Sequence, residues 1–511
     1  MRDARAHARR YLACATGALL ALGACSGGGG GSSGSAGASG ATGTTGVAGA
    51  TGVAGTSGAA GTIGTAGTLG AAGTSGAAGT SGTAGTTGNA GTSGAAGTTG
   101  TGGTSGAAGT TGTAGTSSAG RGGTNTAGTS GIGGRGGTGS GGTAGAFVHP
   151  GLLHAEADLE RMKAKVAAGA EPWISGWNRL VANNHAALTY AARPAAVVYR
   201  GANGTDPENY AQLFNDAAAA YALALRWKIS GDAAYAAKSI EVLNAWSSML
   251  TRIDGTSDKF LAAGLYGYQL ANAAEIVRTY AGWAAADFAR FKTMMRTVFY
   301  AMNHDFLVNH NGACISHYWA NWDLCNMDSA LAIGVLLDDR AIYDEAVQYF
   351  KTGAGNGAIG KAVFIVHPGN LGQWQETGRD QGHNTLGIGL MGAFCEMAWK
   401  QGDDLYGWSQ NRFLAGAEYV AQYNLGMDVP YATYDNCDNV NQTVISATGR
   451  GDDRPIWELV YNHYVVRRGL TAPSVTAYAA KVRPEGGGGN YGPNSGGYDQ
   501  LGYGTLTATL D

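Results

Sequence analysis

The chain has 511 residues, including 88 glycines, and its 33 basic and 36 acidic side chains give a formal net charge of -3. Six Arg and one Asp precede residue 147, so the remainder holds 27 basic and 35 acidic residues and a net charge of -8. This balance excludes a nucleic-acid binder, and a site for an anionic ligand has to be locally positive. The remainder, about 365 residues, is long enough for one large core or two smaller domains.

The N-terminus has the layout of a secretion signal. Four arginines lie in the first ten residues, and the apolar run from Tyr11 to Ala24 is too short to span a bilayer. Residues 22–25, Leu-Gly-Ala-Cys, resemble a bacterial lipobox, and Ser26 after the cysteine implies sorting to the outer membrane. An ordinary signal peptide with a chance cysteine is the alternative. We expect residues 1–25 to be a lipoprotein signal and Cys25 to carry an outer-membrane lipid anchor on an exported protein.

Residues 26–146 have low sequence complexity. Glycine falls at every third position from Gly34 to Gly115, with Ala, Thr and Ser between the glycines. The period is that of collagen, but the segment contains no proline, which collagen-like chains use to stiffen their backbone. We therefore interpret the periodic stretch as part of a disordered tether that carries no charge between Gly34 and Gly115, with a triple helix as the alternative.

The rest of the chain, residues 147–511, is dominated by helical periodicity. Gly-Asp pairs such as Gly231-Asp232 separate neighbouring helical patterns, and no long alternating run of β-branched residues occurs. The pattern predicts an all-α domain, an α/α toroid whose inner helices and loops line a cleft. The helical ranges are 154–166, 212–230, 233–250, 261–281, 284–301, 327–337, 340–353, 386–401, 412–424 and 456–468.

Four cysteines follow Cys25 in the sequence: Cys314, Cys325, Cys395 and Cys437. An exported protein can form disulfides, and four cysteines allow three pairings. A Cys314–Cys325 bond that braces the intervening loop and a pair of buried thiols are both compatible with the sequence, and the spacings do not suggest zinc. The Gly/Tyr/Asn-rich segment 485–503 is expected either to pack over a sugar cleft or to cross the surface.

Two short segments, 310–323 and 373–383, concentrate polar and aromatic side chains. The second places two carboxylates, a guanidinium, an imidazole and an indole within eleven residues, and its glycines predict a bend leading into a helix. Each polar group has to be solvated or paired, so a purely structural segment rarely holds so many. Aromatic rings and amides suit carbohydrate, since they supply stacking area and directional hydrogen bonds. Together the segments predict a sugar site; polar loops that cap helices are the alternative.

The sequence Tyr318-Trp319-Ala320-Asn321-Trp322 resembles a segment of alginate lyases. The sequence from Glu376 to His383, Glu-Thr-Gly-Arg-Asp-Gln-Gly-His, resembles the signature of alginate-lyase-like proteins related to polysaccharide lyase family thirty-eight. The resemblance runs from His149 to the end of the chain. It implies β-elimination on a uronic-acid polymer of alginate or glucuronan type, with no metal or organic cofactor. We expect the protein to act as a monomer on its anionic polysaccharide substrate.

The resemblance also implies roles for individual residues. Asn321 and Arg379 are expected to neutralise the uronate carboxylate, and Glu376 to orient Arg379 or to share a proton with that carboxylate. His383 is the candidate base, because a pKa near 6.5 leaves it neutral at working pH, although a core histidine is the alternative. A tyrosine is the expected acid, with Tyr434 as first choice and Tyr461 as second.

Five further residues are candidates for substrate binding. The chain departs from the Asn-Asn-His arrangement of family-five alginate lyases, since its histidine directly precedes Tyr318. His310 and His317 are subsite ligands or loop residues. Trp322 and Trp374 are stacking platforms or core residues. Arg454 either binds a neighbouring uronate or forms an ion pair with Asp452, Asp453 or Glu458. The candidates are His310, His317, Trp322, Trp374 and Arg454.

Two other functions fit the same residues. A glycoside hydrolase needs two positioned carboxylates, which Glu376 and Asp380 could supply. A lipid-anchored glycan-binding protein without catalysis fits the anchor and tether equally well. The reaction product separates the three functions, because only a lyase leaves a new double bond.

Overall fold

The computed structural model describes residues 146–488 and 498–511, which lie within one compact unit, Gly137–Asp511. The expected signal, the lipid site at Cys25 and the tether lie outside the described residues. Within the described ranges, the search for a helix both long enough and apolar enough to cross a membrane finds none.

Most of this unit is helical. The longer helices are α1 (Glu156–Ala167), α2 (Trp173–Val181), α3 (Tyr210–Ser230), α4 (Ala233–Ser247), α5 (Lys259–Val277), α6 (Ala285–Met294), α7 (Ala301–Asn309), α8 (Ala320–Leu336), α9 (Arg340–Thr352), α11 (Gln381–Lys400), α12 (Trp408–Asn424) and α14 (Pro473–Val482). The short ones are α10 (Ile359–Ala362), α13 (Trp457–Tyr461) and α15 (Gly504–Thr507), with π-helical turns η3 (Met295–Tyr300) and η5 (Asn462–Arg467).

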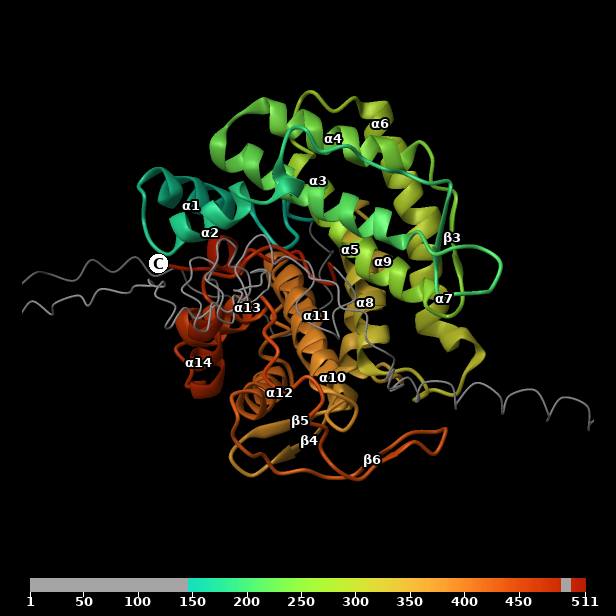
Figure 1. The fold of residues 1–511 in the computed structure, drawn as a ribbon, viewed down its shortest axis with the longest axis vertical. Coiled ribbons are helices and arrows are strands. Elements are labelled where there is room, and N and C mark those ends of the chain that lie inside the picture. Colours follow the sequence, from blue (N-terminus) through green and yellow to red (C-terminus); the bar gives the residue numbers. More distant parts are fainter. Residues whose placement is uncertain (1–145, 489–497) are drawn as a thin grey trace, which may run out of the picture. The chain divides into compact units, whose positions relative to one another are not determined.

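The helices form a ring of inner helices backed by outer ones (Figure 1). Helices α3, α5, α8 and α11 pack against one another in chain order, and α4, α9 and α12 return along α3, α8 and α11. Helix α13 continues the inner row from α11, while α15 contacts both α13 and α1, and α1 contacts α3. The C-terminal helix thus closes the ring, and the predicted all-α, α/α-toroid architecture is confirmed.

Close helix packing explains why the inner helices are rich in small residues. A Cβ on Gly264 of α5 would collide with Cys325 of α8, and one on Gly267 would collide with Ser329. Both helices are buried along nearly their whole length. Glycine at these two positions therefore lets the two central helices approach, and their contact holds α8 in place against α5.

The predicted Gly-Asp turn between α3 and α4 is confirmed. Gly231 has a φ of 78°, a left-handed conformation that ends α3, and the Asp232 side chain accepts a hydrogen bond from Ala234 N (2.9 Å) at the start of α4. Asp339 caps α9 in the same way. These local signals explain why the boundaries of α3, α4 and α9 follow from the sequence.

Several helix boundaries differ from the prediction. Helix α8 begins at Ala320 and α11 at Gln381, seven and five residues before their predicted starts. The polar first turns hid the apolar period there. The range 284–301 is divided into α6 and η3, and the range 456–468 into α13 and η5. Helices α2, α7 and α14 were not predicted.

Three two-stranded sheets join the helices near the ends of the unit. Strand β2 (Val197–Arg200) pairs in parallel with β3 (Arg252–Gly255), and β4 (Val363–His367) pairs antiparallel with β5 (Leu371–Trp374). Strand β6 (Tyr434–Asp435) pairs antiparallel with β7 (Asn441–Gln442). Strand β5 leads directly into the 373–383 segment, and β6 begins at Tyr434, so both strands place candidate site residues.

The four cysteines of the described residues form one disulfide and leave two free thiols. Cys314 and Cys437 form a disulfide, whereas Cys325 and Cys395 are buried free thiols. The predicted Cys314–Cys325 bond is wrong, because Cys325 lies on the face of α8 that packs against Gly264.

The C-terminal segment is not a surface loop at the ends that the structure describes. Asp499 and Tyr503 are buried, and the Tyr498 backbone carbonyl accepts a hydrogen bond from Gln269 of α5 (2.6 Å). The backbone of Gly487 pairs with that of Gly502. These contacts place the described ends against the inner helices.

The buried carboxyl group of Asp328 should make the free energy of unfolding depend on pH. It is fully buried in α8, neither carboxylate oxygen has a hydrogen-bond partner among the described residues, and burial raises its pKa well above the usual range. A raised pKa in the folded state stabilises the protein at low pH, and that stabilisation is lost as the pH rises. We expect Asp328→Asn to become progressively more stable relative to wild type above pH 4, by up to about 1.4 kcal/mol per pH unit. Urea unfolding at pH 5 and pH 7.5 measures this; a pH-independent difference would contradict it.

Candidate active site

The two polar segments meet at the start of α8. Trp319 is the N-cap residue of α8, and its side chain makes no capping hydrogen bond. Gln375 Oε1 accepts a hydrogen bond from Ala320 N (3.0 Å), and Glu376 Oε2 accepts one from Asn321 N (3.1 Å). Two consecutive residues after β5 therefore cap a helix that begins 55 positions earlier.

Glu376 is the centre of the site. Its side chain is fully buried, and Oε1 accepts hydrogen bonds from Asn321 Nδ2 (2.7 Å) and Arg379 Nη1 (2.8 Å). Burial raises the pKa of Glu376, while the charges of Arg379 and His383 and the Asn321 N–H oppose that rise. The carboxylate thus fixes a cation and an amide side by side, and the role of Glu376 in orienting Arg379 on a substrate stays a prediction.

His383 is held in one orientation by Asp380. Asp380 is the N-cap of α11: its Oδ1 accepts from His383 N (2.8 Å) and its Oδ2 contacts His383 Nδ1 (2.7 Å). In the neutral ring this contact requires the proton on Nδ1, which leaves Nε2 with a free lone pair. Burial alone would raise the pKa of Asp380, but the hydrogen bonds and charge of His383 outweigh it and set that pKa below its usual range.

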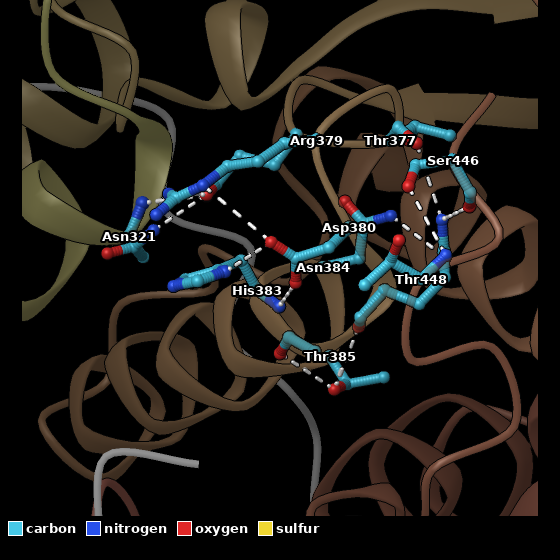
Figure 2. Close-up of polar contacts among 12 residues, drawn as sticks. Asn321, Thr377, Arg379, Asp380, His383, Asn384, Thr385, Ser446 and Thr448 are labelled. Atoms are coloured by element: carbon cyan, nitrogen blue, oxygen red, sulfur yellow. Dashed lines mark hydrogen bonds and ion pairs between the residues drawn. The ribbon is translucent and has the colours of Figure 1, made fainter. Parts of the chain in front are cut away.

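Arg379 and His383 reach toward the same space. Both extend toward Asn321 (Figure 2), and each side chain keeps about a quarter of its surface exposed, 26% for Arg379 and 25% for His383. The first turns of α8 and α11 both face this region, and helix N-termini favour anions. The arrangement offers a partly exposed cation and a proton acceptor to an anionic ligand, while the Asn321 amide beside them is buried (2% exposed).

Tyr434 lies beside this group, next to Trp319. The Trp319 ring is 5.2 Å from the Arg379 guanidinium and 6.2 Å from the Tyr434 ring. The Tyr434 hydroxyl donates to Asn356 Oδ1 (3.3 Å). Burial raises the pKa of Tyr434, while the side-chain amides of Gln375 and Asn356 oppose the rise. The hydroxyl therefore stays protonated at neutral pH, as a proton donor must.

The structure corrects three of the substrate-binding candidates. Trp374 is fully buried and packs on Gly387 of α11, so it cannot stack on a sugar. Arg454 is 4% exposed and binds Asp499 (3.2 Å) and Gln500 Oε1 (3.0 Å), so its guanidinium is buried against the C-terminal segment rather than offered to a uronate. His310 is also buried, with Nε2 3.0 Å from the Tyr349 hydroxyl and 3.3 Å from Asp323 Oδ1.

The other candidates are at least partly accessible. His317 is 44% exposed, and its Nδ1 lies 2.5 Å from Asp438 Oδ2. Trp322 is half-buried and packs on the rings of Tyr318 and Phe306, so most of its surface serves packing. Tyr461, the second choice for the acid, lies on α13 against Arg483 rather than beside Asn321 or Arg379 in any contact that the structure records.

Sequence reasoning missed Trp319, Gln375 and Asn356. Trp319 sits within the aromatic segment that was singled out, yet nothing in the sequence separates it from Trp322 as the ring that touches Arg379. Gln375 directly precedes Glu376, and an amide beside a buried acid could have indicated a capping pair. Asn356 had no signal, since only folding brings it to Tyr434.

One group among the described residues has the spacing of metal ligands: Cys314, Cys437 and Asp438. Its two sulfur atoms are joined in the disulfide, so they are not thiolates. This group therefore serves as a cross-link in the structure.

Glu418 offers a matched comparison for Glu376. It is a buried glutamate of α12 whose carboxylate accepts hydrogen bonds from Ser474 N (3.2 Å) and Val475 N (2.6 Å) at the start of α14. We expect Glu376→Gln and Glu418→Gln each to lower the free energy of unfolding by about 1–3 kcal/mol.

A double-mutant cycle separates the two capping residues. Because Glu376 binds Arg379 and Glu418 does not, Glu376→Gln and Arg379→Ala should show a coupling of about 0.5–3 kcal/mol, whereas the effects of Glu418→Gln and Arg379→Ala should add. Denaturant unfolding of wild type, the three single variants and the two double variants measures both cycles. Equal coupling in the two cycles would contradict the central role of Glu376.

Comparison with known proteins identifies the family. Residues 181–428 match the sequence model of the family described as alginate lyase. No curated protein sequence matches the chain. Similar solved structures include alginate lyase A1-III from Sphingomonas species A1 (15% identity, 69% of this chain and 95% of that chain, TM-score 0.45). A variant of that lyase complexed with a tetrasaccharide (14%, 70% and 97%, TM-score 0.47) is also similar, as is an alginate lyase from Bacteroides ovatus (13%, 71% and 100%, TM-score 0.46). On its match to the family model over residues 181–428, the chain fits the alginate lyase-like family.

Proposed function

We propose that the site cleaves a uronic-acid polymer by β-elimination. The observation that carries this proposal is the meeting of Arg379, Asn321 and the Nε2 side of His383 around one buried carboxylate, Glu376. A uronate substrate needs its carboxylate neutralised and its C5 proton removed, and these groups can do both. The family supports the reaction class, and the geometry supports the assignment of roles.

Neutralisation is the first requirement. The C5 proton is weakly acidic while the neighbouring carboxylate keeps its full charge. Arg379 and Asn321 already donate to Glu376, so their side chains are fixed before substrate arrives and need little reorganisation during reaction. The enolate that forms on proton removal is stabilised by the same donors.

Proton transfer then involves two further side chains. His383 Nε2 takes the C5 proton, the C–H electron pair forms the C4=C5 double bond, and the C4–O4 bond breaks. Tyr434 gives its hydroxyl proton to the departing O4. Asp380 is a positioning residue, because it holds the His383 proton on Nδ1 and keeps Nε2 free.

The substrate class is a polymer of uronic acids, of alginate or glucuronan type. The family model that residues 181–428 match is described as alginate lyase, and one similar structure is of an alginate lyase complexed with a tetrasaccharide. The folded part of this chain is acidic, so attraction of a polyanion has to come from the local cation Arg379 and the N-terminal ends of α8 and α11.

The burial of the carboxylates disfavours the hydrolase alternative. A glycoside hydrolase uses two carboxyl groups that face the scissile bond. Glu376 is fully buried beneath Asn321 and Arg379, and both oxygens of Asp380 are engaged by His383. Neither is free to protonate a glycosidic oxygen or to attack a sugar.

Substitution of His383 or Arg379 tests the proposed chemistry. We expect His383→Ala to lower kcat by about 10²–10⁴-fold and Arg379→Ala by about 10²–10³-fold. The absorbance of the unsaturated product is followed on polymannuronate, polyguluronate and glucuronan, with product masses recorded.

His304→Ala is the matched control for His383→Ala. His304 is an exposed histidine that contacts Glu345 through Nδ1 (2.6 Å), away from the site. It should keep wild-type rates. Near-wild-type rates in both site variants, or saturated products from the wild type, would overturn the proposal.

Asp380→Asn tests whether Asp380 keeps the ring proton of His383 on Nδ1. An asparagine has one side-chain oxygen, so if this oxygen keeps the cap on His383 N, its NH₂ group faces His383 Nδ1. The ring proton would then move to Nε2 and block the base. We expect kcat to fall by about 10²–10⁴-fold, with the free energy of unfolding changed by less than about 1 kcal/mol because asparagine is also a good N-cap. An unchanged kcat would contradict the role of Nε2.

A further inference from the structure

We propose that residues 431–448, here called the bridging loop, position Tyr434 in the site, and that the Cys314–Cys437 disulfide is the contact that holds this loop in place. The inference rests on the proposed function, in which Tyr434 donates a proton to the leaving oxygen. It makes the rate depend on the disulfide, which is not itself one of the reacting groups.

On one side the bridging loop is attached to the first polar segment. The disulfide joins Cys437 to Cys314, and Cys437 N also donates to Ser316 Oγ (2.9 Å). The neighbouring residue, Asp438, contacts His317 Nδ1 (2.5 Å). Three consecutive links therefore connect the tip of the loop to residues just before Trp319.

On its other side the bridging loop is attached to the second polar segment. Ser446 N donates to the Thr377 carbonyl (3.0 Å), and Gln381 N donates to the Thr448 carbonyl (2.8 Å). Gln381 Nε2 also donates to the Ser446 carbonyl (2.8 Å). Figure 2 shows Ser446 and Thr448 beside Thr377, on the opposite side of Asp380 from Asn321. The loop thus spans from the segment of Arg379 to the segment of Asn321.

Tyr434 lies on the same loop, three residues before Cys437. Its hydroxyl donates to Asn356 Oδ1 (3.3 Å), and Asn356 Nδ2 donates to the carbonyl oxygens of Tyr318 (2.7 Å) and Ser316 (3.2 Å). The first polar segment, which carries Cys314, therefore also holds Asn356, the partner of the Tyr434 hydroxyl. Movement of the bridging loop away from Ser316 would separate Tyr434 from Asn356.

The bridging loop has little rigidity of its own. The β6–β7 ladder pairs two residues with two, and most residues from 435 to 445 are exposed or half-buried. A two-stranded hairpin this short is marginally stable without further support. His317 and Asp438 are each more than 40% exposed, and exposed ion pairs contribute little. The covalent bond is therefore the strongest link at the tip.

Reduction of the disulfide tests the proposal directly. Dithiothreitol supplies two electrons and two protons, the S–S bond becomes two thiols, and dithiothreitol closes to its cyclic disulfide. Cys437 is exposed, whereas the thiols of Cys325 and Cys395 are buried. We expect reduced wild type, and the variant Cys314→Ser/Cys437→Ser, to lose kcat by about tenfold to hundredfold with a smaller change in KM. Reoxidation should restore wild type, and dithiothreitol should not affect the double variant.

The loss of a disulfide also lowers stability, so a second comparison isolates positioning. Tyr434→Phe is measured with and without the disulfide, below the melting temperature of each form. If the disulfide acts through the Tyr434 hydroxyl, its removal lowers kcat in wild type but not in Tyr434→Phe. Equal losses in both backgrounds, or an unchanged kcat in reduced wild type, would overturn the inference.

Two further outcomes keep the inference distinct from the proposed function. A wild-type kcat in Tyr434→Phe would overturn the acid role of Tyr434, whatever the disulfide does. Asp438→Asn removes the ion pair but keeps the disulfide, and should lower kcat by less than about twofold. Glu241→Gln, which breaks the exposed Lys238–Glu241 pair on α4, is its control. A loss in Asp438→Asn as large as on reduction would overturn the role given to the disulfide.

Discussion

The site depends on one buried charge, the carboxylate of Glu376. An ionised carboxyl group without solvent is costly unless every oxygen is paired. Here the start of α8, the amide of Asn321 and the guanidinium of Arg379 all pair with it. The same contacts that compensate the burial also fix the two groups proposed to bind substrate. Stability and preorganisation therefore have a common origin at this point.

The fold uses this device more than once. Helices α8, α13 and α14 begin without a capping side chain of their own, and glutamates from other segments accept their first N–H groups. Glu376 does so for α8, Glu418 for α14 and Glu485 for α13. Each contact joins a helix start to a distant segment and so fixes which parts of the ring meet. Among the three, Glu376 is the one that also holds a partly exposed arginine beside the cleft-facing turns.

An acidic protein that binds a polyanion needs its positive charge in one place. Two helix starts, those of α8 and α11, meet at the site, and their N-terminal ends add partial positive charge to that of Arg379. Asp380 offsets part of this positive charge, but both of its carboxylate oxygens contact His383. The balance leaves an arginine and two helix ends facing the substrate, with the carboxylates behind them.

The sequence by itself determined the class of fold, the two polar segments and the family. Helical periodicity and Gly-Asp turns are local signals, so α3, α4 and α9 were predictable, and the density of polar groups around Arg379 and His383 marked the site. The tertiary structure decided which groups meet. Burial removed Trp374, Arg454 and His310 from the substrate, because exposure depends on neighbours far along the chain. It also paired Cys314 with Cys437 across 123 positions and brought Asn356 to Tyr434. Such long-range contacts leave no periodic pattern in the sequence, since they arise only when the helix ring closes and brings its loops together.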